Sequence, residues 1–335
     1  MINKNDFDGS LKFGVKEFIK NTKRDVLASK QLEFRKSLID INNNLLEGIY
    51  DIRSCPCCDS DKYILIFKKL GFSHVKCIDC NMIYTLEVLK DDVVEEYYKL
   101  NELNDEHHKM INAQIDNKLD ILRFDYCLNE ILKHFNTPNN ILDIGCGTGL
   151  FLERAKLRGL QPVGVELNNY AKELTSKRGI AVYGELIENI KFKEKFDIVT
   201  LWTVLEHIVN PKNFIENIIS NMNDKSLLII EVPNINGFAT SLLREKSSTF
   251  AGDQHVTFFS LETMTKFLEN FGFELLHAQT YISEIRTAVN YLNYEDPYSG
   301  ETPLEKYPNI TPEWIHHNLM GHRLFAIFSL NKKEL

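Results

Sequence analysis

A glycine-rich turn follows an apolar run at residues 140–144 and is the feature of this chain with the clearest chemistry. Its three glycines occupy alternate positions, at Gly145, Gly147 and Gly149. Glycine adopts backbone dihedrals that a side chain forbids, and it lets the chain pass close to a ligand. A dinucleotide fingerprint has its third glycine three positions after the second and binds a pyrophosphate at a helix N-terminus. Here Leu150 holds that position, so the spacing does not fit a dinucleotide.

Two acidic residues flank this turn. Asp143 precedes the first glycine by two positions, where its charge would repel a pyrophosphate but suits a cationic or hydroxyl-rich ligand. Glu166 ends a second predicted strand, 21 residues beyond Gly145, where a carboxylate can accept hydrogen bonds from both hydroxyls of a ribose. Together these residues favour S-adenosylmethionine as the ligand.

Other residues at the ends of predicted strands are candidates for the same site. Glu185 follows the third strand and could meet an adenine amino group, while Trp202 and Thr203 end the fourth strand and could wall the adenine or the methionine part. Cys146 lies between two of the glycines and is predicted to be a small residue that fits there. The alternative is that each acid is an ordinary solvated loop residue, and for Glu185 both interpretations stay open.

Histidines are the candidates for acid–base work, because imidazole titrates near neutral pH. His207 follows Glu206 directly after the fourth strand, and His255 lies in the loop after the fifth strand. Either imidazole could remove a proton from an acceptor hydroxyl. The alternative is that each histidine packs and hydrogen-bonds to hold its own loop.

Four cysteines are predicted to bind zinc: Cys55, Cys58, Cys77 and Cys80. They form two CxxC pairs separated by 18 residues, the spacing of a four-thiolate site. Four protein ligands close the coordination sphere, so the zinc would be structural. Cys57 is an additional thiol that could replace a neighbour, and the alternative for the whole set is free buried thiols.

Composition limits the class of protein. The chain has 335 residues, seven cysteines and a formal net charge of −8. No apolar run approaches the roughly 20 residues that span a bilayer, and the first residues lack a signal-peptide pattern. We therefore expect a cytoplasmic protein without a membrane partner, with thiols rather than disulfides. The acidic balance also disfavours a broad nucleic-acid surface.

Patterning predicts four segments: a helical arm at 1–52, a cysteine module at 53–85, a helical linker or cap at 86–137, and an α/β domain at 138–335 with a substrate-side insertion at 281–321. The module contains short strand-like runs at 63–67 and 82–85. In the α/β domain the predicted strands are 140–144, 163–166, 181–183, 196–202, 226–232, 273–281 and 322–330. Alternating strands and helices predict a parallel sheet covered on both faces.

The stripe of Ile115, Leu119, Leu122 and Tyr126 predicts an amphipathic helix that Pro138 ends. The pairs His107–His108 and His316–His317 have no metal-ligand companion at suitable spacing, so they are expected at the surface or on helices. Aromatic residues in the insertion, such as Tyr281, Tyr294 and Trp314, are candidates either for lining a substrate pocket or for packing.

The order of these elements resembles the class I S-adenosylmethionine-dependent methyltransferases over residues 110–280. The matching segments are 143–149, 165–167, 196–199, 204–207 and 270–273. The resemblance implies an α/β, Rossmann-like sheet of seven strands whose last strand, at 322–330, runs antiparallel to the rest. It also implies that Asp143 and the glycine loop contact the cofactor, with Glu166 on the ribose and Leu167 beside it.

A cysteine module ahead of such a domain resembles bacterial methyltransferases that modify deoxysugars on nucleotide carriers. In the C-methyltransferases of that group, a tyrosine and a glutamate accompany a histidine after the fifth strand. This sequence keeps His255 but has Gln254 at the acidic position and Gly252 near the tyrosine position. The resemblance therefore implies a small-molecule acceptor, a sugar or glycan precursor, with O- or N-methylation favoured over C-methylation.

The mechanism predicted is an in-line methyl transfer with a histidine general base. Two alternatives remain. The first is an RNA methyltransferase whose zinc ribbon grips nucleic acid through its lysines, among them Lys62, Lys68, Lys69 and Lys76. The second is a non-catalytic protein that binds the cofactor and a protein partner. The sequence leaves the oligomeric state open.

Overall fold

A computed structural model describes residues 2–9, 11, 24–94 and 114–331. The predicted N-terminal arm, at 1–52, and the predicted helical linker, at 86–137, fall partly outside these ranges, and the pair His107–His108 lies outside them entirely. None of the helices in the described ranges combines the length and the apolar content that crossing a bilayer requires.

The central sheet has seven strands, as predicted, in the order β12-β13-β10-β9-β6-β7-β8. All neighbours are parallel except β13, which pairs antiparallel with both β10 and β12. β6 is buried along its whole length, as expected for a parallel strand covered on both faces. The strands are β6 (Asn140–Ile144), β7 (Gln161–Val165), β8 (Ala181–Tyr183), β9 (Phe196–Trp202), β10 (Met222–Pro233), β12 (Phe273–Tyr281) and β13 (Arg323–Leu330).

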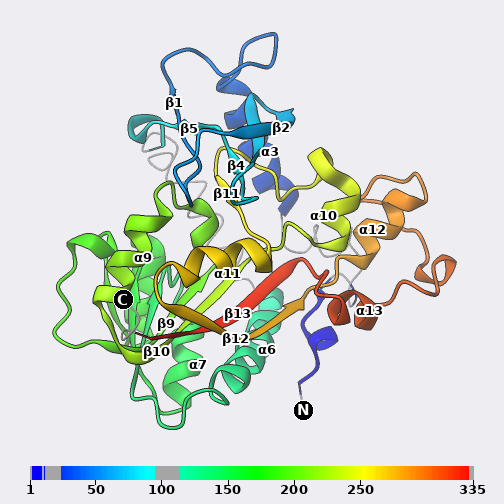
Figure 1. The fold of residues 1–335 in the computed structure, drawn as a ribbon. Coiled ribbons are helices and arrows are strands. Elements are labelled where there is room, and N and C mark those ends of the chain that lie inside the picture. Colours follow the sequence, from blue (N-terminus) through cyan, green and yellow to red (C-terminus); the bar gives the residue numbers. More distant parts are fainter. Residues whose placement is uncertain (1, 10, 12–23, 95–113, 332–335) are drawn as a thin grey trace.

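Helices cover both faces of this sheet (Figure 1). α6 (Gln114–Ile131) and α7 (Leu150–Leu157) pack on one face, and α9 (Pro211–Ser220) and α11 (Leu261–Glu269) pack on the other. α8 (Asn169–Lys177) lies along β8. A capping box at Ser260 begins α11, and Gly272 follows its end with φ of 73°. The prediction that Pro138 ends α6 is wrong, because the helix ends at Ile131 and turns carry the chain onward.

The cysteine module contains a four-stranded sheet in the order β11-β4-β3-β2. Three strands belong to the predicted module: β2 (Tyr63–Lys69), β3 (Phe72–Cys77) and β4 (Ile83–Thr85). The fourth, β11 (Thr257–Phe258), comes from the loop after β10, beyond the predicted boundary at residue 85. In Figure 1, β11 reaches up from the central domain into the module. The two folding units therefore share one sheet.

The remaining elements frame these two sheets. β1 (Tyr50–Ile52) pairs with β5 (Glu87–Leu89) beside the module. The other helices are α3 (Arg24–Ser37), α10 (Phe238–Leu243), α12 (Ile285–Leu292) and α13 (Pro312–His317), with short 3-10 turns η1 (Lys4–Asp6), η2 (Ile187–Asn189), η3 (Leu205–His207), η4 (Arg244–Lys246) and η5 (Leu304–Lys306). α12 and α13 share a small apolar cluster of Ile285, Val289 and Ile315.

Candidate active site

The glycine loop joins β6 to α7 in a conformation that requires glycine. Gly145, Gly147 and Gly149 all have positive φ, at 72°, 52° and 74°. The amides of Gly145 and Cys146 both donate to the Val165 carbonyl at the end of β7, at 2.8 and 3.0 Å. A Cβ on Gly145 would lie 2.6 Å from a methyl group of Val204. The loop is therefore closely packed at the carboxyl ends of the strands, where open α/β sheets bind ligands.

Asp143 lies at the end of β6 and is only 1% exposed. Its carboxylate accepts a hydrogen bond of 2.7 Å from the Thr200 hydroxyl, and burial raises its pKa well above the usual range. Cys146 is also buried, and its Sγ lies 2.6 Å from where a Cβ on Gly164 would stand. The side chain of Cys146 therefore packs against a glycine of β7, where a second side chain would not fit.

Glu166 lies just after β7 and ties the glycine loop to the next helix. Its two carboxylate oxygens accept hydrogen bonds from the amides of Gly147, at 2.8 Å, and of Asn168, at 2.7 Å. Leu167 beside it is 56% exposed, and Glu185 is exposed after β8. These side chains form an open flank next to the loop, so their assignment to a ribose and an adenine stays a prediction.

Trp202 and Thr203 occupy different surroundings at the end of β9. The Trp202 indole is buried, with its ring 4.8 Å from the ring of Phe151 and 5.2 Å from that of Phe124. Trp202 is thus a core residue in this structure rather than an open wall. Thr203 has a φ of 55°, and its amide donates to the Glu231 carbonyl at 2.8 Å, which turns the chain toward the loop of His207.

Glu206 and His207 lie in one loop and His255 in another, and the structure brings all three side chains close together. The sequence alone did not predict this proximity. One nitrogen of each imidazole and one carboxylate oxygen of Glu206 lie within 4.8 Å of one another. The two rings meet edge to face, with centroids 4.9 Å apart. The amide of Val256 donates to the Glu206 carbonyl at 2.9 Å and joins the loops directly.

Hydrogen bonds to the backbone fix both rings. Nδ1 of His207 lies 3.0 Å from the Gln254 carbonyl, and Nδ1 of His255 lies 2.9 Å from the Thr249 carbonyl. A carbonyl can only accept, so each Nδ1 carries the proton. In the neutral ring this leaves a lone pair on Nε2, which is the nitrogen that can receive a proton.

Burial decides the charge of this cluster. Glu206 is 2% exposed, and neither of its oxygens has a hydrogen-bond partner among the described residues. Burial raises its carboxyl pKa to about 8. Burial also lowers the pKa of both imidazoles, and the neighbouring His207 lowers that of His255 further. The lowered pKa, about 4, keeps the His207 imidazole neutral near pH 7, and its side chain remains 36% exposed.

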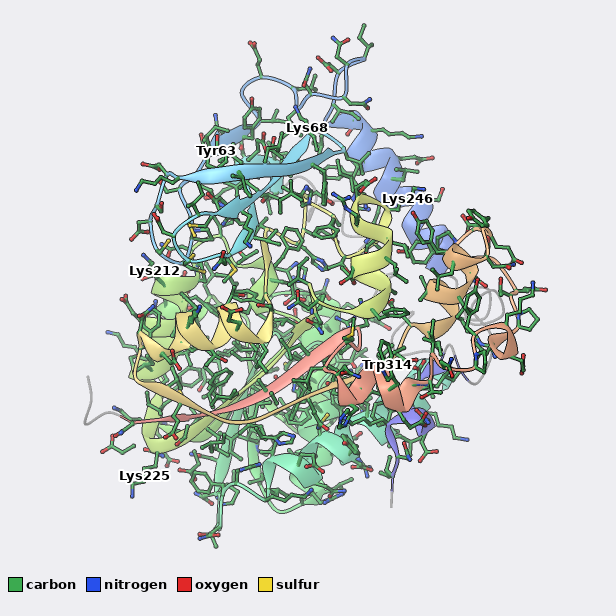
Figure 2. The ribbon with its side chains drawn as sticks, turned by 45° about the vertical axis from the view of Figure 1, so that its right-hand side comes forward. Tyr63, Lys68, Lys212, Lys225, Lys246 and Trp314 are labelled. Atoms are coloured by element: carbon green, nitrogen blue, oxygen red, sulfur yellow. The ribbon has the colours of Figure 1, made fainter. Side chains whose placement is uncertain are left out.

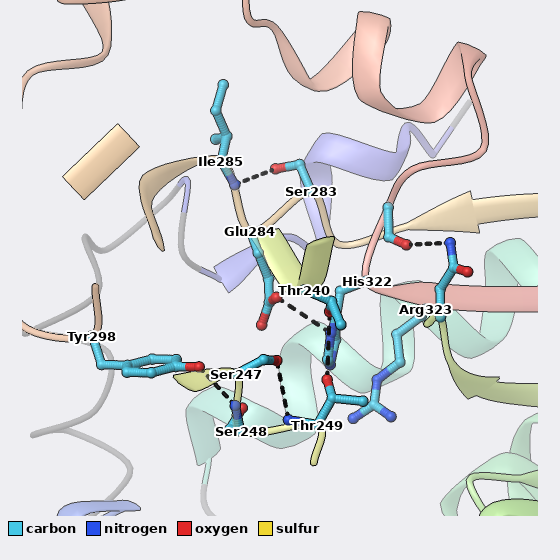
Figure 3. A network of polar contacts seen from close by, with 12 residues as sticks. Thr240, Ser247, Ser248, Thr249, Ser283, Glu284, Ile285, Tyr298, His322 and Arg323 are labelled. Atoms are coloured by element: carbon cyan, nitrogen blue, oxygen red, sulfur yellow. Dashed lines mark hydrogen bonds and ion pairs between the residues drawn. The ribbon is translucent and has the colours of Figure 1, made fainter. Parts of the chain in front are cut away.

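A second polar network was not predicted from the sequence. Glu231 on β10 accepts from Nη1 of Arg123 on α6, at 2.5 Å, and from the hydroxyl of Tyr281. Arg323 at the start of β13 lies 3.9 Å from the same carboxylate. Figure 3 shows Arg323 beside His322, whose Nδ1 is 3.3 Å from a carboxylate oxygen of Glu284. These residues come from segments that are far apart in sequence and belong to no spacing motif, so no sequence signal could have grouped them.

The aromatic residues expected either to line a pocket or to pack differ in their exposure. Tyr281 is fully buried and belongs to the core, Tyr294 is fully exposed, and Trp314 is partly exposed. His316 lies on the helix α13, one of the two expected placements, but its side chain is buried, with Nδ1 3.3 Å from the Thr280 hydroxyl. His317 on the same helix is exposed, as expected.

The four predicted zinc ligands come together in the cysteine module. Their sulfur atoms all lie within 4.8 Å of one another, and the pairs Cys55–Cys80 and Cys58–Cys77 are each 3.5 Å apart. That separation is too long for a disulfide, which needs about 2.05 Å. It is close to the edge of a tetrahedron with Zn–S bonds of about 2.3 Å, which is about 3.8 Å. The donor set therefore fits a structural zinc ion, and Cys57 lies outside it.

Comparisons with known proteins concern the α/β domain. A family described as a methyltransferase domain matches residues 121–278. The uncharacterized protein MJ1123 of Methanocaldococcus jannaschii is 30% identical over 158 residues, which cover 47% of this chain and 75% of that protein. A ubiquinone biosynthesis O-methyltransferase of Rickettsia canadensis is 28% identical over 123 residues, covering 34% of this chain and 51% of the relative. The match thus spans about half the length of that enzyme.

Solved structures of similar shape include the plantazolicin methyltransferase BpumL in complex with S-adenosylhomocysteine. It is 16% identical, covers 71% of this chain and 94% of its own, and has a TM-score of 0.48. A possible histamine N-methyltransferase from Thermotoga maritima is 18% identical, covers 66% of this chain and 96% of its own, and has a TM-score of 0.43.

Proposed function

Because the chain belongs to the class I S-adenosylmethionine-dependent methyltransferases, we propose that it methylates an oxygen or nitrogen of a small molecule, a sugar or glycan precursor on a nucleotide carrier. The methyl donor follows from the family. The acceptor class is inferred from the surroundings of His207 and His255 and from the cysteine module.

The observation that carries this proposal is the pair of neutral imidazoles at the carboxyl end of the sheet. Both rings donate Nδ1–H to a carbonyl and keep a lone pair on Nε2. A hydroxyl or an ammonium group must lose a proton when it becomes methylated, and a positioned imidazole is suited to receive it. We assign this role to His207 or His255, with Glu206 as their buried neighbour.

The surroundings of Gly252 support O- or N-methylation over C-methylation. A Cβ at this position would lie 2.5 Å from the Cβ of Phe72 in the cysteine module. No larger residue fits without displacing β3, so a tyrosine in the manner of the sugar C-methyltransferases is sterically excluded there. Gln254 likewise supplies an amide where those enzymes have a carboxylate.

In this proposal the chain contributes mainly alignment. When bound, S-adenosylmethionine supplies an electrophilic methyl group on its sulfonium. Asp143, Glu166 and the glycine loop would hold the cofactor, with Leu167 and Glu185 on the open flank. Orientation of two reactants can lower a barrier by about 7–11 kcal/mol, and a general base adds roughly 10²- to 10⁴-fold.

The nucleic-acid alternative has weaker support. Of the module's lysines, Lys69 donates to the Ser247 carbonyl and Lys68 to the Asn44 side chain. Lys68 and Tyr63 lie on the outer strand of the module, which Figure 2 shows on the side away from the central sheet. The net charge of −8 also opposes binding to a polyanion.

A methyl-transfer assay tests the proposal. The protein would be incubated with isotope-labelled S-adenosylmethionine and four acceptor pools: nucleotide-linked sugars, free sugars, phenolic metabolites and RNA. We expect label in the nucleotide-sugar pool. Replacing His255 or His207 with alanine should lower turnover on that acceptor by about 10²- to 10⁴-fold while S-adenosylhomocysteine still binds.

His317→Ala is the matched control, because this histidine is exposed on α13. Label in RNA alone would favour the nucleic-acid alternative. Full turnover in both His207→Ala and His255→Ala would remove the imidazoles from the mechanism.

A further inference from the structure

We propose that Arg53 of the cysteine module is a positioning residue that holds the loops of His207 and His255 in their mutual arrangement. The inference rests on the proposed function, since it assigns the two imidazoles to the reaction. It gives the module a part in building the active site, in addition to its own folding.

The guanidinium of Arg53 donates to backbone carbonyls of three separate segments. Nε donates to Thr85 at the end of β4, at 3.0 Å. Nη1 donates to Val209, two residues after His207, at 3.0 Å. Nη2 donates to Val256, directly after His255. One planar group thus contacts the module and both histidine loops.

Backbone bonds also link the two loops to each other and to the module. The Val256 amide donates to the Glu206 carbonyl, at 2.9 Å. β11 is only two residues long and pairs with β4 through Thr257↔Tyr84 and Phe258↔Ile83. The Thr85 amide also donates to the Val256 carbonyl, at 3.0 Å. The Val209 carbonyl, by contrast, has only Arg53 as a donor among the described hydrogen bonds. Removing the guanidinium would therefore cost the loop of His207 its direct bond to the module and leave it joined indirectly, through the bond from the Val256 amide to the Glu206 carbonyl.

Arginine suits this position for a geometric reason. Its guanidinium is flat and offers five N–H donors in a fixed fork, whereas lysine offers one flexible ammonium group. The group lies over the ring of Tyr84, 5.5 Å from the ring centroid, which holds its plane. A lysine at position 53 could reach one of the three carbonyls but could not bridge all of them.

The contact affects the imidazoles because their partners belong to the same loops. Nδ1 of His207 lies against the Gln254 carbonyl, so the ring of one loop is fixed by the backbone of the other. Any separation of the two loops would break this bond and free the His207 ring. Arg53 therefore acts on the proton acceptor through the backbone, without touching the acceptor itself.

The test uses the full-length protein with Arg53→Met and Arg53→Lys. Hydrogen–deuterium exchange would be followed in peptides that cover residues 204–209 and 249–258. We expect exchange in both peptides to rise about tenfold or more in Arg53→Met, and by less in Arg53→Lys, because a local contact is lost while the rest of the fold stays closed. Peptides from the central sheet should exchange as in the wild type.

The imidazoles supply a second measurement that a purely structural role would not change. Nitrogen-15 spectra of His207 and His255 should report protonated Nδ1 in the wild type and mixed tautomers in Arg53→Met. With an acceptor, kcat should fall at least tenfold in Arg53→Met while the KM for S-adenosylmethionine stays within twofold.

Lys212→Ala is the matched control. Lys212 on α9 pairs with Asp59 and also joins the module to the central domain, at the junction labelled in Figure 2. It contacts neither histidine loop in the described hydrogen bonds, so its loss should leave both peptides and both tautomers unchanged.

Wild-type exchange and wild-type tautomers in Arg53→Met would overturn the proposal. A uniform rise in exchange across the chain in both Arg53 variants would also overturn it, because Arg53 would then stabilise the whole fold. If no acceptor is methylated, the proposed function fails, but exchange and tautomers still test the role of Arg53. If the wild type methylates an acceptor but exchange and tautomers do not change in Arg53→Met, only the present inference fails.

Discussion

Replacement of Glu206 with glutamine should stabilise the protein at neutral pH. The carboxyl group is 2% exposed and has no hydrogen-bond partner among the described residues. Burial raises its pKa from 4.5 to about 8. In the folded protein Glu206 therefore keeps its proton over a pH range in which the unfolded chain has already released it.

The sign and size of the effect follow from this difference. Below pH 4.5 both states are protonated, so the group does not affect stability. Between pH 4.5 and about 8 the unfolded state gains by ionising, and the free energy of unfolding falls as the pH rises. At about 1.4 kcal/mol per pKa unit, the loss reaches about 3 kcal/mol at pH 7 and about 5 kcal/mol above pH 8.

Urea unfolding of the wild type and of Glu206→Gln at pH 5, 6, 7 and 8 measures this. Glutamine has the same shape and does not titrate, so the stability difference between the two proteins should widen with pH by several kcal/mol. Glu216→Gln, an exposed replacement on α9, should follow the wild type at every pH. Parallel curves for the wild type and Glu206→Gln would refute the assignment of a buried, protonated carboxyl.

Three further changes test other parts of the site. Glu166→Ala should weaken S-adenosylhomocysteine binding at least tenfold in calorimetry, because the amide of Gly147 loses its acceptor; unchanged affinity would contradict the cofactor assignment. Cys77→Ser should reduce bound zinc, measured by metal analysis, from one ion per chain toward none and lower the melting temperature. Gly252→Ala should cost about 1–3 kcal/mol in urea unfolding through its clash with Phe72, and a neutral result would contradict the close packing described here.

The central sheet could be predicted because its strands have strong local patterns. β6, β9 and the second half of β10 are rich in apolar residues and almost wholly buried, as expected for strands covered on both faces. The glycine loop was also predictable, since positive φ at alternate positions leaves few residue types to choose from. The four cysteines came together as predicted because their spacing alone encodes two metal-binding turns.

The cysteine module was predicted less completely. β3 was missed because it contains Ser73, His74 and Lys76 among its apolar residues, which weakens the alternation that marks a strand. His74 is nevertheless buried, since it stacks on Phe67 at 4.7 Å between ring centroids. Burial of this imidazole depends on tertiary contacts that no local pattern records.

Trp202 illustrates the limit of placing residues by strand position alone. It does end β9 as predicted, but a strand presents successive side chains to opposite faces. Which face is filled depends on α6 and α7, whose Phe124 and Phe151 pack on the indole. The sequence therefore predicts where the strand ends, but it does not predict which side chains from other elements cover each of its faces.

The same limit applies to the two histidines. The sequence identified each as a candidate for acid–base chemistry but did not predict that they lie side by side. His207 and His255 are 48 positions apart, and the segment between them contains β10 and α10. Two contacts between the loops bring them together: the Val256 amide donates to the Glu206 carbonyl, and His207 bonds to the Gln254 carbonyl. The loop of His255 is in turn held by the pairing of β11 with β4, in a module that lies more than 170 positions earlier in the chain. A two-residue strand has no periodic signal. The cysteine module thus contacts the loop of His255 through backbone bonds. If Arg53 has the role proposed above, a change in the module that loosens β4 should disturb the imidazoles before it disturbs the glycine loop.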